Sequence, residues 1–211
     1  MRKSIIAILM TFCLSIMTYA QTPQDRATEL KNQAQSSLNQ KDYIKARYLF
    51  KKAYEAFATR ENYPQAIESG VQANALYVRE NFYKEGFELC RDMDQLIWAG
   101  EQNQKKVFYD LRFLVNKERL QMYTALKNPA QAKTQLNKLE ETANLAKNDS
   151  LTEVLLYTKA NYYYTFNQNT QGDACFRKLI NQYKEKKDYA KVSDCYKNLI
   201  GIARKANNAP L

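Results

Sequence analysis

The chain of 211 residues contains no histidine, and this absence removes much of ordinary enzyme chemistry. Histidine is the side chain that changes charge near neutral pH, so general acid–base catalysis by histidine and the Ser-His and Cys-His nucleophile pairs are excluded. The commonest zinc ligand is missing as well. There is no Gly-rich phosphate loop, no GxSxG motif and no CxxC motif. These absences predict a protein that is not an enzyme and that binds no cofactor or metal.

Cysteine is scarce, with four residues in the whole chain. Cys13 falls in the N-terminal leader described below, and Cys90 is most simply a small buried apolar residue. Cys175 and Cys195 are separated by the length of one helix plus one turn. Spacing alone does not give disulfide geometry, so the sequence leaves open whether these two residues are bridged.

Glycine and proline are also few, at five and four residues. Because these residues punctuate turns, their scarcity favours long helices with short links and argues against a sheet-rich fold. Apolar residues make up 45% of the chain, a normal share for a folded protein. The composition predicts an all-α protein.

Long apolar runs are confined to the N-terminal end of the chain, before Gln21. Two basic residues precede an apolar stretch from Ile5 to Met17, and small side chains lead up to Ala20. The stretch is short for a membrane span, which needs about 20 residues. The segment 1–20 is therefore predicted to be a signal peptide that is cleaved near Ala20, so that the mature protein is exported.

The formal charge is +10, and removal of the leader leaves 30 Lys and Arg against 22 Asp and Glu. Such a balance can indicate nucleic acid, a membrane surface or an acidic partner. No basic block is longer than three residues, and most lysines alternate with polar residues. We expect a solvated outer face and no nucleic-acid partner.

The apolar pattern is clearest between Asp42 and Ala53. Ala46, Phe50 and Ala53 stand at i, i+4 and i+7, so a helix would carry a small, a large and a small side chain on one stripe. A neighbouring helix can pack into such a stripe, and Ala34 marks a second apolar pattern just before it.

The same stripe recurs along the chain, where Gly86, Ala132 and Gly172 take the place of Ala46 at roughly even intervals. The residues expected to pack between repeats are Ala34, Ala46, Phe50, Ala53, Gly86, Cys90, Ala132, Leu136, Ala160, Gly172, Phe176 and Leu179. This layout resembles the tetratricopeptide repeat (TPR), in longer repeats than the usual ones of about 34 residues. The interval between Gly86 and Ala132 is the longest and marks the most irregular repeat. The resemblance implies a right-handed α-solenoid of antiparallel helix hairpins, with about four and a half repeats.

Polar residues mark the expected helix starts. Asp42 and Asp188 are expected to cap helices, as are Asn62 and Asn128. The stretch Ser150–Glu153 has the sequence of a capping box and predicts another start.

The expected organisation is one helical-repeat domain over residues 21–207, followed by the truncated end of a turn at 208–211. A break between helices is expected at Gly100–Asn103. The last helix carries Tyr196 and Ile200 and does not have the polar face of a capping helix. We therefore expect that the chain is a fragment, or that a partner covers this face.

Tyrosine is abundant, with 16 residues, and three of them follow one another at 162–164. Three consecutive helical residues point in different directions, so at least one is expected to face a groove, although core packing explains any single one as well. Tyrosine and asparagine side chains suit the binding of an extended peptide. The candidate groove residues are Tyr162, Tyr164, Asn161, Asn167, Lys159 and Asn198.

The order of leader and repeats resembles the periplasmic N-terminal TPR sensor region of Gram-negative histidine kinases and DNA-binding regulators. The resemblance implies a periplasmic scaffold that binds a protein or peptide, forms part of a larger signalling protein and meets the membrane only through a downstream segment. A freestanding periplasmic protein that binds a peptide or an envelope-assembly partner is the alternative. A weaker alternative is a helical-array enzyme that acts on an anionic polysaccharide. The ligand and the oligomeric state stay open.

Overall fold

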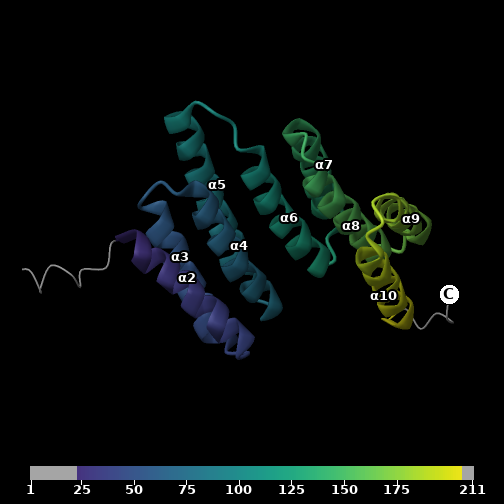
Figure 1. The fold of residues 1–211 in the computed structure, drawn as a ribbon, viewed down its shortest axis with the longest axis horizontal. Helices are drawn as coiled ribbons and strands as arrows, with labels where there is room; N and C mark the ends of the chain where they lie inside the picture. Colours follow the sequence, from purple (N-terminus) through teal and green to yellow (C-terminus); the bar gives the residue numbers. More distant parts are fainter. Residues whose placement is uncertain (1–22, 206–211) are drawn as a thin grey trace, which may run out of the picture. The chain divides into compact units, whose positions relative to one another are not determined.

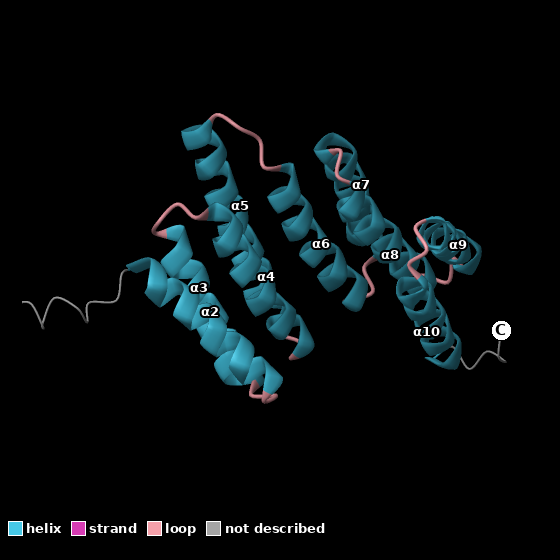
Figure 2. Ribbon diagram, in the orientation of Figure 1, coloured by secondary structure: helices cyan, strands magenta, loops and turns pink. Residues whose placement is uncertain are grey.

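The computed structural model describes residues 23–205, and within that range it contains helices, turns and loops but no strand (Figures 1 and 2). The prediction of an all-α protein is confirmed. In chain order the helices are α2 (Pro23–Asn39), α3 (Tyr43–Ala58), α4 (Tyr63–Arg79), α5 (Tyr83–Gln104), α6 (Tyr109–Ala125), α7 (Pro129–Ala146), α8 (Asp149–Thr165), α9 (Asn169–Glu185) and α10 (Tyr189–Lys205). The predicted signal peptide with its cleavage site at Ala20, Cys13 and the predicted turn at 208–211 lie outside the described residues.

One turn recurs between successive helices, and its mark is a residue with positive φ. These residues are Lys41, Glu61, Asn81, Lys105, Lys127, Lys147, Asn167 and Lys187. They are evenly spaced along the chain except on either side of Lys105, where the spacing is wider. The left-handed conformation usually belongs to glycine, so its use by lysine and glutamate hides these turns from a search for glycine.

The hydrogen bonds of the first turn explain why the links are so short. The N–H of Lys41 donates to the carbonyl of Leu38, and the N–H of Asp42 donates to the carbonyl of Ser37. This pair of bonds satisfies the last carbonyls of α2. The carboxylate of Asp42 then accepts the N–H of Lys45 at 3.2 Å and caps α3. A single residue thus completes one helix and begins the next.

The predicted caps at Asp42, Asn62, Asn128 and Asp188 are confirmed, because each side chain accepts a backbone N–H three residues later. The predicted capping box at Ser150–Glu153 is wrong. Helix α8 begins two residues earlier than the box requires, and the side chain of Asn148 caps it by accepting the N–H of Ser150 at 3.0 Å. Asn148 occupies the same place in its turn as Asn128 does.

The predicted break at Gly100–Asn103 is also wrong. Helix α5 continues to Gln104, and Gly100 is buried inside it. The helix ends at Lys105, whose φ of 50° makes the left-handed cap. The carboxylate of Glu101 accepts the N–H of Phe108 at 2.9 Å, so the extra turn of α5 holds the start of α6.

The chain divides into two compact units, of which the first ends at Leu76 and the second begins at Tyr77. In the first unit α2 packs along α3, and Ala34, Ala46 and Phe50 are fully buried. Lys31 of α2 donates to Gln65 at 2.9 Å and pairs with Glu68 at 2.8 Å, which ties α2 to α4.

In the second unit, neighbouring helices from α5 to α10 pack against one another, and α6 also contacts α8. Two apolar clusters form its core. The first comprises Phe113, Leu120, Ala132, Leu136, Leu139, Ala143, Leu155 and Tyr162. The second comprises Leu156, Ala160, Cys175, Phe176, Leu179, Ile180, Tyr183, Val192 and Cys195.

All twelve residues expected to pack between repeats are buried. Four of them stand at equivalent points of the turn pattern, since Ala46, Gly86, Ala132 and Gly172 each follow a positive-φ residue by five positions. None of the described helices combines the length and the apolar composition needed to cross a bilayer.

Helix α10 exposes apolar side chains, as its sequence suggested. Tyr196 is 47% exposed and Ile200 is 49% exposed. Leu156 and Ala160 occupy the matching positions of α8, one hairpin earlier, and are buried. Leu156 and Ala160 belong to the second core cluster with α9, whereas α10 contributes Val192 and Cys195 to that cluster and leaves Tyr196 and Ile200 outside it.

Candidate functional site

The candidate site is a hollow between α6 and α8, here called the α6–α8 groove, with a volume of about 300 Å³. Its lining is mostly uncharged and rich in hydroxyl and amide groups. The lining residues are Leu120, Gln121, Thr124, Ala125, Lys127, Tyr157, Thr158, Asn161, Tyr162 and Thr165. Amide and hydroxyl groups both donate and accept hydrogen bonds, so such a lining matches the main chain of a peptide.

Two of the six predicted groove residues line this groove. Asn161 is half-buried, and Tyr162 is 5% exposed. The ring of Tyr162 lies 5.4 Å from that of Tyr163 and 5.0 Å from that of Phe166, between ring centroids. Burial, with a smaller contribution from Tyr163, raises the pKa of Tyr162.

A third predicted residue, Asn198, reaches this region through Tyr157. The hydroxyl of Tyr157 donates to the side-chain oxygen of Asn198 at 3.0 Å, and the Asn198 amide donates to the carbonyl of Asp194 at 2.8 Å. A row of polar groups therefore leads from α8 to α10. Tyr157 was missed because it lies outside the conspicuous run at 162–164.

Tyr164 packs against α9. Its hydroxyl donates to the carboxylate of Asp173, and its ring lies 6.1 Å from that of Phe176. The ring also covers Gly172, where an added Cβ would come within 2.7 Å of it. Burial and the neighbouring Asp173 raise the pKa of Tyr164.

The remaining two predicted residues also have structural partners. Asn167 is the positive-φ residue of the turn between α8 and α9, with φ of 58°. Lys159 pairs with Glu140 of α7 at 2.7 Å. Burial is the largest single effect and lowers the pKa of Lys159, but the hydrogen bond to Glu140 and the charge of that carboxylate act together in the opposite direction, and the net pKa is raised. Neither residue lines the α6–α8 groove.

The carboxylate of Glu153 joins three helices, which the sequence did not suggest. It accepts hydrogen bonds from Lys186 at 2.7 Å and from Lys191 and Tyr183 at 3.2 Å each. The bond from Lys186 is the main reason that the pKa of Glu153 is lowered. Assigning this residue to a capping box concealed its role as a link from α8 to α9 and α10.

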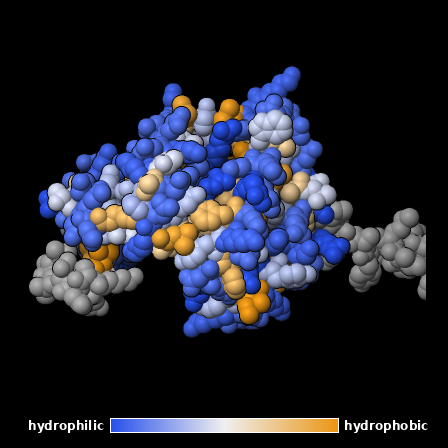
Figure 3. Space-filling view, turned by 180° about the vertical axis from the view of Figure 1, so that it is seen from behind, coloured by the Kyte–Doolittle hydropathy of each residue, from blue (hydrophilic) through white to orange (hydrophobic). Residues whose placement is uncertain are grey.

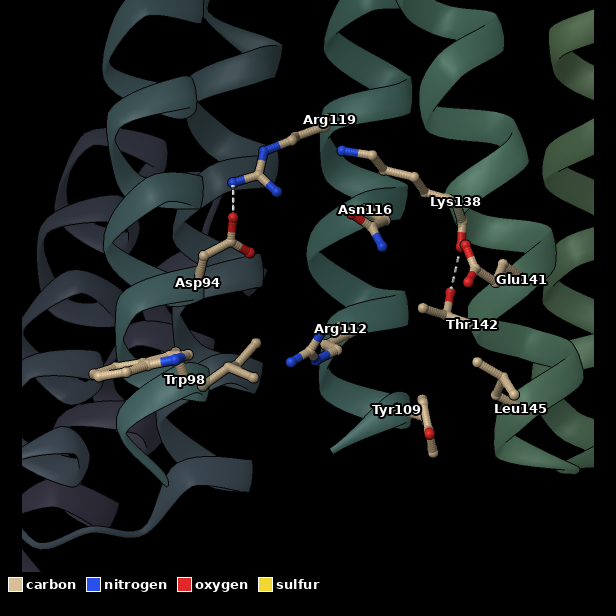
Figure 4. Close-up of a pocket in the computed structure, with 11 residues that line it drawn as sticks. Asp94, Trp98, Tyr109, Arg112, Asn116, Arg119, Lys138, Glu141, Thr142 and Leu145 are labelled. Atoms are coloured by element: carbon tan, nitrogen blue, oxygen red, sulfur yellow. Dashed lines mark hydrogen bonds and ion pairs between the residues drawn. The ribbon is translucent and has the colours of Figure 1, made fainter. Parts of the chain in front are cut away.

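A second hollow of about 450 Å³, the α5–α6–α7 pocket, contains more charge (Figure 4). Its lining residues are Asp94, Ile97, Trp98, Tyr109, Arg112, Asn116, Arg119, Lys138, Glu141, Thr142 and Leu145. Arg119 pairs with Asp94 and also donates to the carbonyl of Cys90 at 2.9 Å. Arg112 pairs with Glu101, which lies beside the pocket. Sequence analysis did not single out this pocket, because its residues come from three separate helices.

The thiols of Cys90, Cys175 and Cys195 are free and buried. Burial raises the pKa of Cys90 to about 12, and it also raises the pKa values of Cys175 and Cys195. Protonated, buried thiols are poor nucleophiles, so these three residues act as packing groups. Within residues 23–205 no group of histidine, cysteine and acidic side chains is arranged to hold a metal ion.

The face shown in Figure 3 is mostly hydrophilic, and its apolar residues form small separate patches. Binding on this face would depend on polar groups as much as on apolar area. No protein-family model matches the chain, and a search of curated proteins finds no similar sequence.

Proposed function

We propose that the chain is a non-catalytic protein-interaction scaffold of TPR-like helical hairpins, which binds an extended segment of a partner protein along the α6–α8 groove. One observation carries this proposal. Buried small residues at 46, 86, 132 and 172 each follow the recurring turn by five positions, which is the register expected of a repeated hairpin.

The chemistry of the groove favours a peptide over a charged ligand. Lys127 is its one charged lining residue among those described. Thr124 and Asn161 offer donors and acceptors for peptide groups, and Thr158 offers an acceptor, since its hydroxyl donates to the carbonyl of Val154. Tyr157 and Tyr162 add aromatic area at a low cost in side-chain entropy.

A matched pair of threonine substitutions tests this binding mode. Peptides selected from a random phage-displayed library on the wild-type protein should lose binding to Thr124→Arg, which fills the groove. They should still bind Thr134→Arg, which places the same side chain on the exposed face of α7. Equal binding of the selected peptides to both variants, or failure to select any peptide, would contradict the proposal.

The scaffold is proposed to be exported and to serve as the periplasmic sensing part of a larger signalling protein. The leader pattern in residues 1–20 supports export. N-terminal sequencing of the protein from a periplasmic extract should begin at Gln21. The gene should continue into an apolar span and an output domain, and a stop codon after Leu211 would favour the freestanding alternative.

A further inference from the structure

The α5–α6–α7 pocket has a charged end and a mixed end, where Arg112 lies among aromatic and aliphatic side chains (Figure 4). In Figure 4, Arg119 and Lys138 lie at one end, and Trp98, Tyr109 and Leu145 lie at the other. Tyr109 and Arg119 are ten residues apart on α6, which is about 15 Å along the helix axis. A ligand in this pocket meets both kinds of surface.

Most charges in the pocket already have partners, but two do not. The guanidinium groups of Arg112 and Arg119 are paired with Glu101 and Asp94. In the described part of the chain, the charged groups of Lys138 and Glu141 form no hydrogen bond or ion pair, although they stand three residues apart on α7. The pocket therefore offers one free ammonium and one free carboxylate on the same helix, both on exposed side chains.

We propose that this pocket binds a free amino acid with an apolar side chain. The α-carboxylate of the ligand pairs with Lys138 and its α-ammonium pairs with Glu141. These two residues are separated by about 4.5 Å along the axis of α7. Their long side chains can therefore reach the carboxylate and the ammonium, which are attached to the same Cα of the ligand. The ligand's side chain lies toward Ile97 and Leu145.

Charge balance argues for a zwitterion over a simple anion or cation. An anion would have to sit near both Asp94 and Glu141, and a cation near Arg119 and Lys138. A ligand that carries both charges avoids this repulsion. The volume of about 450 Å³ lies in the range of small-molecule sites.

Trp98 makes binding directly measurable, because it is the single tryptophan of the sequence and lines the pocket. Titration with L-leucine should give a saturable change in the fluorescence of Trp98 under selective tryptophan excitation. Calorimetry provides a second, independent measurement of binding. N-acetyl-L-leucine lacks the ammonium and L-leucinamide lacks the carboxylate. Each should bind about two- to fivefold more weakly than leucine, since each leaves one exposed protein charge unpaired and water screens such a pair.

Substitutions on α7 separate the two charge contacts. Lys138→Gln should remove the preference for leucine over leucinamide, and Glu141→Gln should remove the preference over N-acetyl-leucine. Lys133→Gln, on an exposed part of α7, should change neither preference. Absence of saturable binding, equal affinity for the three compounds, or unchanged preferences in both variants would overturn the proposal. The peptide test concerns Thr124 in the α6–α8 groove, whereas this test concerns Lys138 and Glu141. Failure of one proposal can therefore be distinguished from failure of the other.

Discussion

The link between α5 and α6 depends on the carboxylate of Glu101, whose side chain is only 6% exposed. It accepts the N–H of Phe108 at 2.9 Å and the Nε–H of Arg112 at 2.7 Å, and it receives a second bond from the same guanidinium. The hydrogen bonds from Arg112 hold the pKa of Glu101 below its usual range, although burial acts in the opposite direction. Removing the charge should therefore destabilise this link.

Glu101→Gln keeps the size of the side chain but places an amide where Arg112 needs an acceptor. Hydrogen bonds to charged groups contribute about 1.5–3 kcal/mol. The side chain of Arg112 is 46% exposed, so water screens part of the interaction and we expect a loss of about 2 kcal/mol. Arg112→Ala should cost about 2–3 kcal/mol, because it leaves a nearly buried carboxylate without its cation. The double variant should lose less than the two single losses together.

The same contact predicts a dependence on pH. Because the pKa of Glu101 is lower in the folded protein than in the unfolded chain, its contribution is fully present above the unfolded value of about 4.3. It is lost as the pH falls through the lower folded value. The difference in unfolding free energy between wild type and Glu101→Gln should therefore shrink in acid.

Urea unfolding followed by Trp98 fluorescence measures this directly, because Trp98 lies three residues before Glu101 on α5. Urea is preferred to guanidinium, which would screen the ion pair. Asp194→Asn is the control, since it removes a carboxylate whose side chain is 64% exposed and whose partner is Lys197. Asp194→Asn should lower the unfolding free energy by less than about 1 kcal/mol. A Glu101→Gln loss no larger than the control, or a difference that persists in acid, would refute the reasoning.

Gly172→Ala should destabilise the protein by about 1–3 kcal/mol, because the new Cβ would lie 2.7 Å from the ring of Tyr164, which Asp173 holds in place. Gly201→Ala adds a methyl group with nothing within 4 Å and should stabilise α10 by about 0.5–1 kcal/mol. Thermal unfolding followed by circular dichroism measures both glycine variants, and equal shifts in their melting temperatures would contradict the packing around Gly172. Lys187→Gly should raise stability by about 0.5–1 kcal/mol, because it relieves a left-handed residue with φ of 56°. Asn167→Gly should raise the unfolding free energy by less than Lys187→Gly does, since asparagine tolerates the left-handed conformation. Urea unfolding measures both variants, and a larger increase for Asn167→Gly would argue against this explanation.

Much of the fold could be predicted because the local signals agree with one another. Helix starts at Asn62 and Asn128 follow from side chains that accept an N–H within their own turn, so no distant residue is needed. Burial of Ala46 and Phe50 follows from periodicity in the same way. The end of α5 could not be predicted, since it depends on Glu101 receiving bonds from residues on the far side of a loop.

The candidate site was only partly predictable for a related reason. Asn161 and Tyr162 stood out by composition, but Tyr157 gains its place from a bond to Asn198, which lies two helices later in the chain. Lys159 and Tyr164 have suitable chemistry for a groove, yet their partners Glu140 and Asp173 fix them elsewhere. Residue type indicates what a side chain can bind, whereas its partner decides whether it is free to do so.

The recurring turn explains why the scaffold is easier to infer than its ligand. Most of these turns are completed by backbone bonds, and several add one polar cap such as Asp42 or Asn128, so the turn constrains few side chains beyond itself. The buried small residues five positions later add a second constraint. Some residues that line the two hollows belong to this framework, since Lys127 forms a turn, Leu120 is buried and Arg112 pairs with Glu101. Other lining residues, such as Gln121 and Lys138, are exposed and can vary without loss of the helical pairs. Specificity therefore resides in the surface residues that repeat periodicity does not determine, and direct binding measurements at these two hollows are the way to establish it.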